Sequence, residues 1–143
     1  MNNYRFYGHE TKSVSPINKE FAFIKDQRHL YDLMNDIWSI DSCAPRYRKE
    51  WSKENKTVGQ CSITAFLVQD IFGGLVYGVP LPEGGYHCFN NVNGVIFDIT
   101  SEQFGNTVLD YQNVTLQSRE EHFASEEKYQ RYLLIKKALL ERK

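Results

Sequence analysis

The chain has 143 residues, of which 41% are hydrophobic and 24% are charged, and its formal net charge is −1. This length suits one domain with one core, so we expect a single domain over residues 1–143. The balanced charge argues against nucleic acid or an anionic membrane as a partner. Three cysteines cannot close a disulfide framework and no N-terminal apolar run resembles a signal peptide, which together predict a reducing, cytoplasmic location.

The first part of the chain predicts one helix. Residues 1–25 form a weakly patterned arm, in which residues 21–24 are an apolar run that fits either a strand or the lead-in to a helix. A helix is expected over residues 26–40, because Asp26 suits an N-cap and apolar residues then recur at helical spacing. Residues 39–57 are polar and charge-rich, as is typical of a solvated loop or helix face.

A second, more apolar helix is expected from Cys61 to Phe72. Gly73 and Gly74 end it, since glycine accepts the left-handed conformation that closes a helix. A strand over residues 75–79 and a loop over residues 80–85 follow. This helix reads as the central, buried one.

Residues 107–143 alternate at first and then return to helical spacing. Residues 107–117 predict one or two further strands. Ser125, followed by two acidic residues, opens a terminal helix. Its predicted buried face comprises Tyr129, Tyr132, Leu133, Lys136 and Leu140.

Residues 86–100 predict a β-hairpin, because Asn93-Gly94 is a strong two-residue turn signal. If these two residues form the turn, His87 and Asp98 become diagonal neighbours on one face, about 7–8 Å apart at the backbone. Cys88 then points to the opposite, more apolar face and is expected to be a buried core thiol.

Cys61 meets the requirements of a thiol nucleophile. A thiol at a helix N-terminus lies beside the positive end of the helix dipole, which favours the thiolate. We therefore predict a catalytic set in which Cys61 attacks, His87 is the base and Asp98 orients the imidazole. The backbone N–H of Cys61 would donate to the oxyanion, and the side-chain amides of Asn55 and Gln60 are the candidates to complete the oxyanion hole.

No cofactor and no metal site is predicted. Cys61, His87, Cys88 and Asp98 can be read as metal ligands, but they lack the CxxC or HxxxH spacing typical of such sites. The remaining histidines have no comparable context and are expected at the surface or in packing: His9, His29 and His122.

Two resemblances add to this interpretation. Residues 50–105 resemble the YunG-like family of small bacterial proteins, through Gly59-Gln60-Cys61-Ser62, His87, Asn90, Asp98-Ile99-Thr100, Gln103 and Phe104. The layout is also similar to papain-like cysteine peptidases, where a Cys begins the central helix and the His and Asp or Asn come from the following sheet. That similarity implies an α+β, papain-like fold, with N-terminal helices and the Cys-bearing central helix packed on an antiparallel β-sheet. It also places Asn55 where papain-like enzymes carry their oxyanion-hole Gln.

The expected function is thiol-dependent cleavage of an amide, isopeptide or thioester bond, or transfer of its acyl group, on a peptide or small acyl substrate. A non-catalytic binding module on a papain-like fold and a redox-sensing thiol protein are the alternatives. The sequence specifies neither the substrate nor the oligomeric state.

Overall fold

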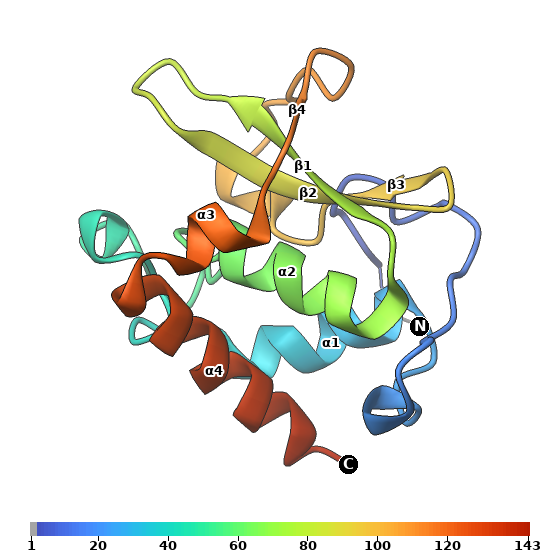
Figure 1. Cartoon of the computed structure of the whole chain (residues 1–143). Helices are drawn as coiled ribbons and strands as arrows, with labels where there is room; N and C mark the ends of the chain where they lie inside the picture. The colour runs from blue at the N-terminus through green and yellow to red at the C-terminus, as the bar shows by residue number, and fades with distance from the viewer. Residues whose placement is uncertain (1–2) are drawn as a thin grey trace.

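The chain forms four α-helices, which the computed structural model places on one side of a small sheet; the structure describes residues 3–143. The helices are α1 (Gln27–Ile37), α2 (Cys61–Phe72), α3 (Arg119–Phe123) and α4 (Glu126–Leu140), with 3-10 turns η1 (Lys19–Phe21), η2 (Pro45–Tyr47) and η3 (Ser101–Phe104). The strands are β1 (Leu75–Pro80), β2 (Tyr86–Val92), β3 (Val95–Phe97) and β4 (Thr115–Leu116). They form an antiparallel sheet in the order β3-β2-β1-β4 (Figure 1). The α+β class is therefore as predicted.

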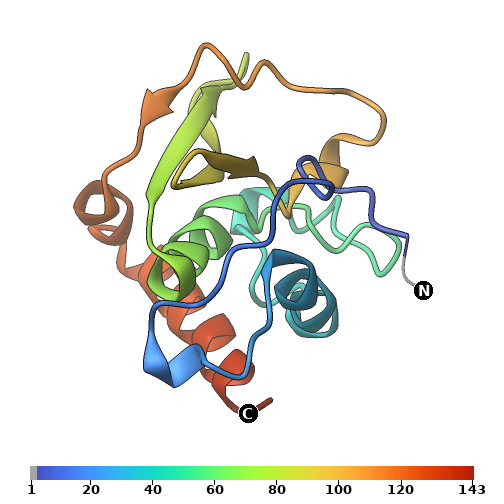
Figure 2. The same ribbon diagram turned by 90° about the vertical axis from the view of Figure 1, so that its right-hand side faces the viewer.

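Helix α2 lies between the sheet and the pair α1 and α4 in both views (Figures 1 and 2). Its predicted bounds are confirmed, and Gly73 closes it at φ 82. Eight of its 12 residues are buried, among them Ile63 and Leu67 on one side and Phe66 on another. A largely apolar helix is expected at such a central position.

Helix α1 begins as predicted and ends early. The Asp26 side chain accepts the His29 N–H at 2.9 Å and so caps the helix. Trp38 leaves the helical region at ψ 131, before the predicted end at residue 40. Its indole N–H donates to Thr64 Oγ1 at 3.0 Å, which ties the end of α1 to α2. The apolar run at residues 21–24 is a lead-in to α1 through η1, not a strand.

The β2–β3 hairpin has the predicted register. Val92 pairs with Val95 and Asn90 pairs with Phe97. The ladder stops there, and Asp98 instead forms an isolated bridge with Tyr7, whose carbonyl accepts the Asp98 N–H at 2.9 Å. The N-terminal arm thus runs beside the hairpin (Figure 2).

The C-terminal third differs most from expectation. Residues 107–117 contain only the short β4, and the short helix α3 was not predicted. Helix α4 starts at the predicted Ser125 cap, which accepts the Lys128 N–H at 3.2 Å. Of its predicted face, Tyr132 is buried, and Tyr129, Leu133 and Leu140 are partly buried against the core. The prediction did not include the other buried residues of α4: Arg131, Ile135 and Leu139. Arg131 was missed because it is buried through polar contacts, with Glu127 at 2.6 Å and with the Ser42 carbonyl at 3.1 Å.

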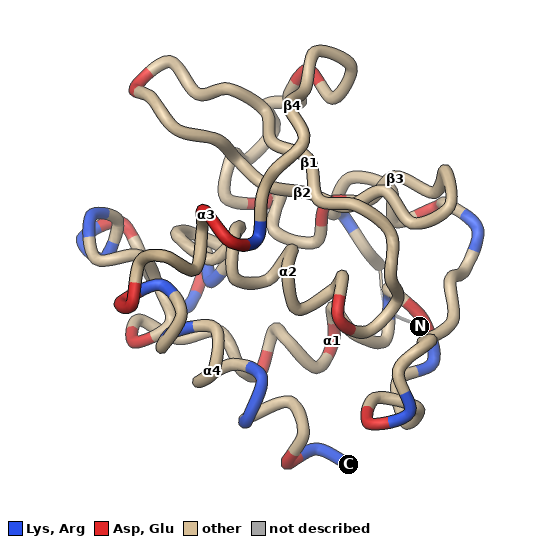
Figure 3. The backbone as a smooth tube through the Cα atoms, viewed as in Figure 1, with Lys and Arg blue, Asp and Glu red and all other residues tan. Residues whose placement is uncertain are grey.

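Charges of both signs are interspersed along the backbone (Figure 3). Within residues 3–143, no helix is long and apolar enough to cross a membrane.

Candidate active site

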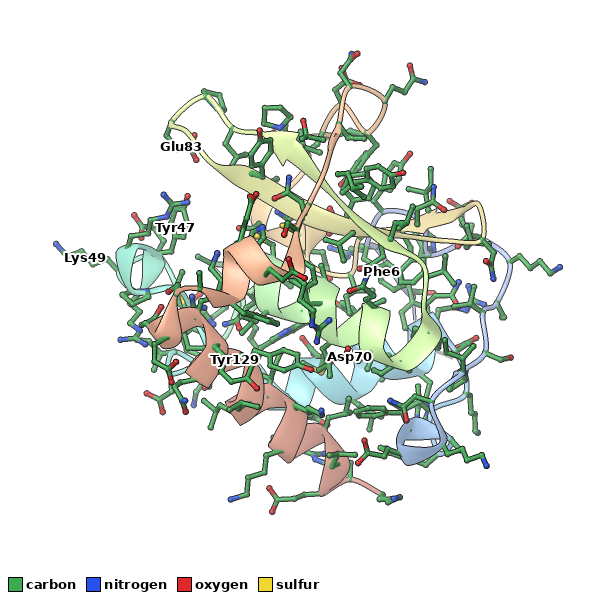
Figure 4. All side chains as sticks on the ribbon, in the orientation of Figure 1. Phe6, Tyr47, Lys49, Asp70, Glu83 and Tyr129 are labelled. Atoms are coloured by element: carbon green, nitrogen blue, oxygen red, sulfur yellow. The ribbon has the colours of Figure 1, made fainter. Side chains whose placement is uncertain are left out.

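A groove of about 850 Å³ lies at the first turn of α2, where Cys61 and Ser62 line it. Cys61, His87 and Gln103 are among its lining residues. One wall is η2 with its neighbours, a second is the loop between β1 and β2, and a third is formed by α3 and the start of α4. Tyr47 of η2 and Glu83 of the β1–β2 loop lie on the same side of the molecule (Figure 4), and the Tyr47 hydroxyl donates to Glu83 Oε1 at 3.4 Å.

His87 and Asp98 are joined directly. His87 Nε2 donates to Asp98 Oδ2 at 2.7 Å, and each side chain is 1% exposed. The carboxylate has further donors, since the Tyr111 hydroxyl donates to Oδ2 at 2.7 Å and the Thr100 N–H to Oδ1 at 3.3 Å. A buried ionised pair is stable only when its remaining hydrogen-bonding sites are satisfied in this way. Tyr111 in turn stacks on Tyr7 at 3.9 Å between ring centroids.

The imidazole of His87 is fixed in one orientation. Because Nε2 is occupied by Asp98, Nδ1 is the nitrogen available to the Cys61 thiol. Gln103 Nε2 lies 3.1 Å from Nδ1 and donates to it in the neutral form of the ring. The Phe104 ring meets the imidazole edge-on at 4.7 Å and an angle of 85°. Such constraints hold a base in a single tautomer and position.

The surroundings of Cys61 favour its thiolate. A hydrogen bond from the Cys88 thiol and the neighbouring His87 imidazolium hold the pKa of Cys61 well below its usual value, although burial opposes this. Burial also disfavours the charged form of His87, but the Asp98 carboxylate and the Cys61 thiolate outweigh it and raise the pKa of His87 to about 10. The two shifts support each other, because the Cys61 thiolate and the His87 imidazolium each stabilise the charge of the other.

Cys88 is buried, as predicted, and packs with Ala65, Phe66 and Val76. Its contact with Cys61 was not predicted, because the hairpin register describes only the sheet and not the helix that covers it. The hydrogen bond to Cys61 and burial raise the pKa of the Cys88 thiol. The two thiols therefore differ in character: the surroundings favour the thiolate of Cys61 and the protonated thiol of Cys88.

Comparison with known proteins places the chain in a family. A family model described as YunG protein matches residues 26–143, which is most of the chain. The chain belongs to the YunG family. It is also 38% identical, over 104 residues, to a protein of Bacillus subtilis (strain 168) described as uncharacterized protein YunG, a match that covers 71% of this chain and 84% of that relative. No solved structure gives a significant match.

The YunG family match is wider than the motif that suggested it. The resemblance covers residues 50–105, whereas the family model also takes in α1, α3 and α4. It leaves out the N-terminal arm, residues 1–25, including Tyr7. Cys61, His87 and Asp98 all lie within the matched region.

Asn55 and Gln60 lie outside the groove of this YunG-family protein. Asn55 Oδ1 accepts from the Thr57 hydroxyl at 3.2 Å. Gln60 is fully buried and its amide donates to the Ser39 carbonyl at 3.0 Å. The oxyanion role of Asn55 or Gln60 stays a prediction. At the start of α2, Gln60 makes no side-chain cap, so the first N–H groups of the helix are not satisfied by it.

Two residues that contact the His87–Asp98 pair were not predicted from the sequence. Gln103 and Tyr111 contact His87 and Asp98, respectively. Gln103 had a signal, because it is among the residues that carry the family resemblance, but no role was assigned to it. Tyr111 had none, since it comes from a segment of irregular backbone that the alternating pattern assigned to a strand.

His122, expected at the surface or in packing, is half-buried at the groove wall. Its ring packs against Phe66 at 5.1 Å, its Nε2 contacts Gln117 Oε1 at 2.8 Å, and its Nδ1 accepts from Lys128 Nζ at 2.9 Å. Burial and the Lys128 charge lower the pKa of His122 to about 4, so it is neutral near pH 7. Nowhere in residues 3–143 do three or more His, Cys, Asp and Glu side chains gather in a way that would hold a metal ion.

Proposed function

We propose that this YunG-family protein is a thiol-dependent hydrolase or acyltransferase with a papain-like layout, acting on an amide, isopeptide or thioester bond. The observation that carries the proposal is the chain of contacts from Asp98 through His87 to Cys61. Asp98 holds one ring nitrogen at 2.7 Å while the same imidazole stabilises the Cys61 thiolate. A nucleophile, a base and a group that orients the base, each from a different segment, are the parts that acyl transfer requires.

In the proposed reaction the Cys61 thiolate attacks the acyl carbon, a C–S bond forms, and the carbonyl electron pair moves to oxygen. Collapse of this intermediate expels the leaving group, which takes the proton from His87 Nδ1, and an acyl thioester remains on Cys61. Water, or an acceptor amine or thiol, then attacks the thioester with His87 as the base. The step returns the thiolate and releases an acid or a transferred acyl product.

The oxyanion of each intermediate needs donors. The N–H of Cys61, in the first turn of α2, is one candidate. Gln103 is a second, because Nδ1 no longer accepts from it once that nitrogen carries a proton. The Gln103 amide at the groove wall is then free to donate to the substrate. It joins Asn55 and Gln60 as a candidate for the side-chain donor.

The state of the groove favours catalysis over a non-catalytic binding module. A pure binding module on this fold would have the thiol and imidazole out of reach of each other, or the groove filled by Tyr86 or Trp51. Here Tyr86 is 40% exposed at the groove wall, and Trp51 is not among the lining residues. An extended peptide or acyl chain is the occupant such an open groove fits.

The test is selective alkylation followed by substrate trapping. The protein is treated with iodoacetamide at pH 6, and the label on each cysteine is quantified by mass spectrometry. A free thiol is only about 0.3% thiolate at this pH, so an ionised Cys61 should react faster by on the order of tenfold, after allowing for the lower nucleophilicity of a less basic thiolate. Cys43 and Cys88 serve as internal references, because both thiols have raised pKa values. Burial raises the pKa of Cys43, and the neighbouring Cys61 raises the pKa of Cys88.

Model amides, isopeptides and thioesters are then incubated with the protein, and the mixture is quenched in acid. An acyl adduct on Cys61 that is absent from the Cys61→Ser variant is the expected result. The proposal fails if Cys61 reacts with iodoacetamide no faster than a free thiol and no substrate class leaves an adduct.

A further inference from the structure

Cys61 begins α2, and Cys88 lies on β2, the strand against which this helix packs. Ala65, one helical turn after Cys61 and on the same side of α2, accepts a hydrogen bond at its carbonyl from Asn90 Nδ2 at 2.9 Å. Asn90 and Cys88 lie two residues apart on β2 and so point to the same face of the sheet. One turn of the helix is thus registered against one two-residue repeat of the strand, which sets Cys61 opposite Cys88 at the preceding position of each element. The pKa values of the two thiols shift in opposite directions because each acts on the other.

We propose that Cys61 and Cys88 are a redox pair, in which Cys88 captures oxidised Cys61 as a reversible disulfide and switches the proposed thiol chemistry off. The inference rests on the proposed function in one respect, since it takes Cys61 to be the reactive thiol. It goes further by assigning a chemical role to Cys88, which acyl transfer does not use.

Hydrogen peroxide, a general two-electron oxidant of thiolates, is the co-reactant. The Cys61 sulfur attacks one peroxide oxygen, the O–O bond breaks, and the departing hydroxide takes a proton from His87 to leave as water. Cys61 is then a sulfenic acid. The Cys88 sulfur attacks the Cys61 sulfur, an S–S bond forms, and the hydroxyl leaves as a second water with the Cys88 proton. Two thiols lose two electrons in total, and one peroxide becomes two waters.

Access decides which thiol is oxidised first. Cys61 is half-buried and lines the groove, whereas Cys88 is 1% exposed and enclosed by Ala65, Phe66 and Val76. An oxidant that enters from the groove therefore reaches Cys61 first. The Cys88 sulfur is then already in position to attack the sulfenic acid formed on Cys61. A sulfenic acid with a neighbouring resolving thiol is protected from irreversible further oxidation.

Cys43 provides an internal control. It is also buried, but its thiol contacts the Ala44 carbonyl at 3.4 Å, and a side chain at Gly59 would come within 2.5 Å of its sulfur. This places Cys43 in its own tightly packed loop.

The experiment uses the wild-type protein. It is exposed to peroxide in its folded state, free thiols are blocked with an alkylating reagent after denaturation, and the peptides are mapped by mass spectrometry. We expect a linked peptide pair containing Cys61 and Cys88, released by dithiothreitol, with Cys43 alkylated. Recovery of Cys61 as sulfenic or sulfinic acid with Cys88 still alkylated would overturn the proposal.

Two variants sharpen the result. In Cys88→Ala, the sulfenic acid at Cys61 has no resolving partner, so its labelling by dimedone should rise at least several-fold over wild type. Cys43→Ala should match wild type in both readouts. Iodoacetamide labelling of the reduced protein separates the two proposals: fast labelling of Cys61 without a disulfide refutes only the redox pair, whereas a Cys61 that neither labels nor oxidises refutes both.

Discussion

The substitution Asp98→Asn tests the electrostatics of the site most directly. Asn is nearly the same shape, so it can keep a hydrogen bond to His87 Nε2 while removing the negative charge. The carboxylate is the largest influence that raises the pKa of His87. Without it, that pKa must fall, because burial then opposes the imidazolium with less compensation.

The magnitude follows from the shift itself. The rise from 6.5 to about 10 corresponds to about 5 kcal/mol of preference for the protonated ring. Asp98 contributes through both its charge and its hydrogen bond, and Cys61 through the same two effects. If Asp98 supplies half or more, the pKa of His87 should drop by about two units, a hundredfold change in its protonation equilibrium.

The assay is a pH titration of the ring nitrogens of His87, followed by NMR in protein with labelled histidine. Wild-type His87 should stay doubly protonated through pH 8, whereas the Asp98→Asn ring should lose its proton at lower pH. Tyr111→Phe is the matched control, because it removes the hydroxyl that donates to Asp98 at 2.7 Å and leaves the charge in place. The reasoning is refuted if a folded Asp98→Asn protein titrates as wild type, or if Tyr111→Phe lowers the pKa equally.

Three further outcomes are expected. Lys128 lines the groove and has no carboxylate partner within residues 3–143. Lys128→Gln should therefore slow alkylation of Cys61 by the anion iodoacetate, relative to neutral iodoacetamide, by about threefold. Lys137→Gln, at an exposed position, should leave this ratio of rates unchanged. Gly74→Ala should lower the free energy of unfolding by more than about 1 kcal/mol in urea titrations, since Gly74 has φ 80 and an added Cβ would lie 2.4 Å from a β2 carbonyl oxygen. Leu67→Ala, at a fully buried position, should lower the urea midpoint by the equivalent of about 2–5 kcal/mol, with an unchanged slope.

Strong local signals made part of this structure predictable. The Gly73-Gly74 pair ends α2, and Asn93-Gly94 turns the hairpin with Val92 opposite Val95. Because side chains alternate along a strand, that register alone was enough to bring His87 and Asp98 to one face. The 2.7 Å contact between them also depends on Tyr7 and Tyr111, which hold Asp98 beyond the end of the ladder.

What the sequence did not predict depends on packing between distant segments. The register of α2 over β2, which joins Cys61 to Cys88, is set by the way the helix lies on the sheet, and no periodicity within either segment encodes it. The buried Arg131 was misplaced for a related reason: hydrophobic spacing treats a charged residue as exposed, whereas Glu127 and the Ser42 carbonyl compensate its charge inside. Tyr111 is held by its hydroxyl on Asp98, a bond across a loop without regular structure.

The bridge between Tyr7 and Asp98 has a consequence for how this protein compares with its relatives. Asp98 is held from one side by the backbone of Tyr7 and from the other by Tyr111, whose ring rests on that of Tyr7. The N-terminal arm therefore helps to hold Asp98, the residue that orients His87, although the family model starts only after this arm. A homologue without this contact would have to hold the equivalent of Asp98 in place by other residues. The N-terminal arm is therefore a segment in which family members can differ in how rigidly they hold this carboxylate, while Cys61, His87 and Asp98 stay the same.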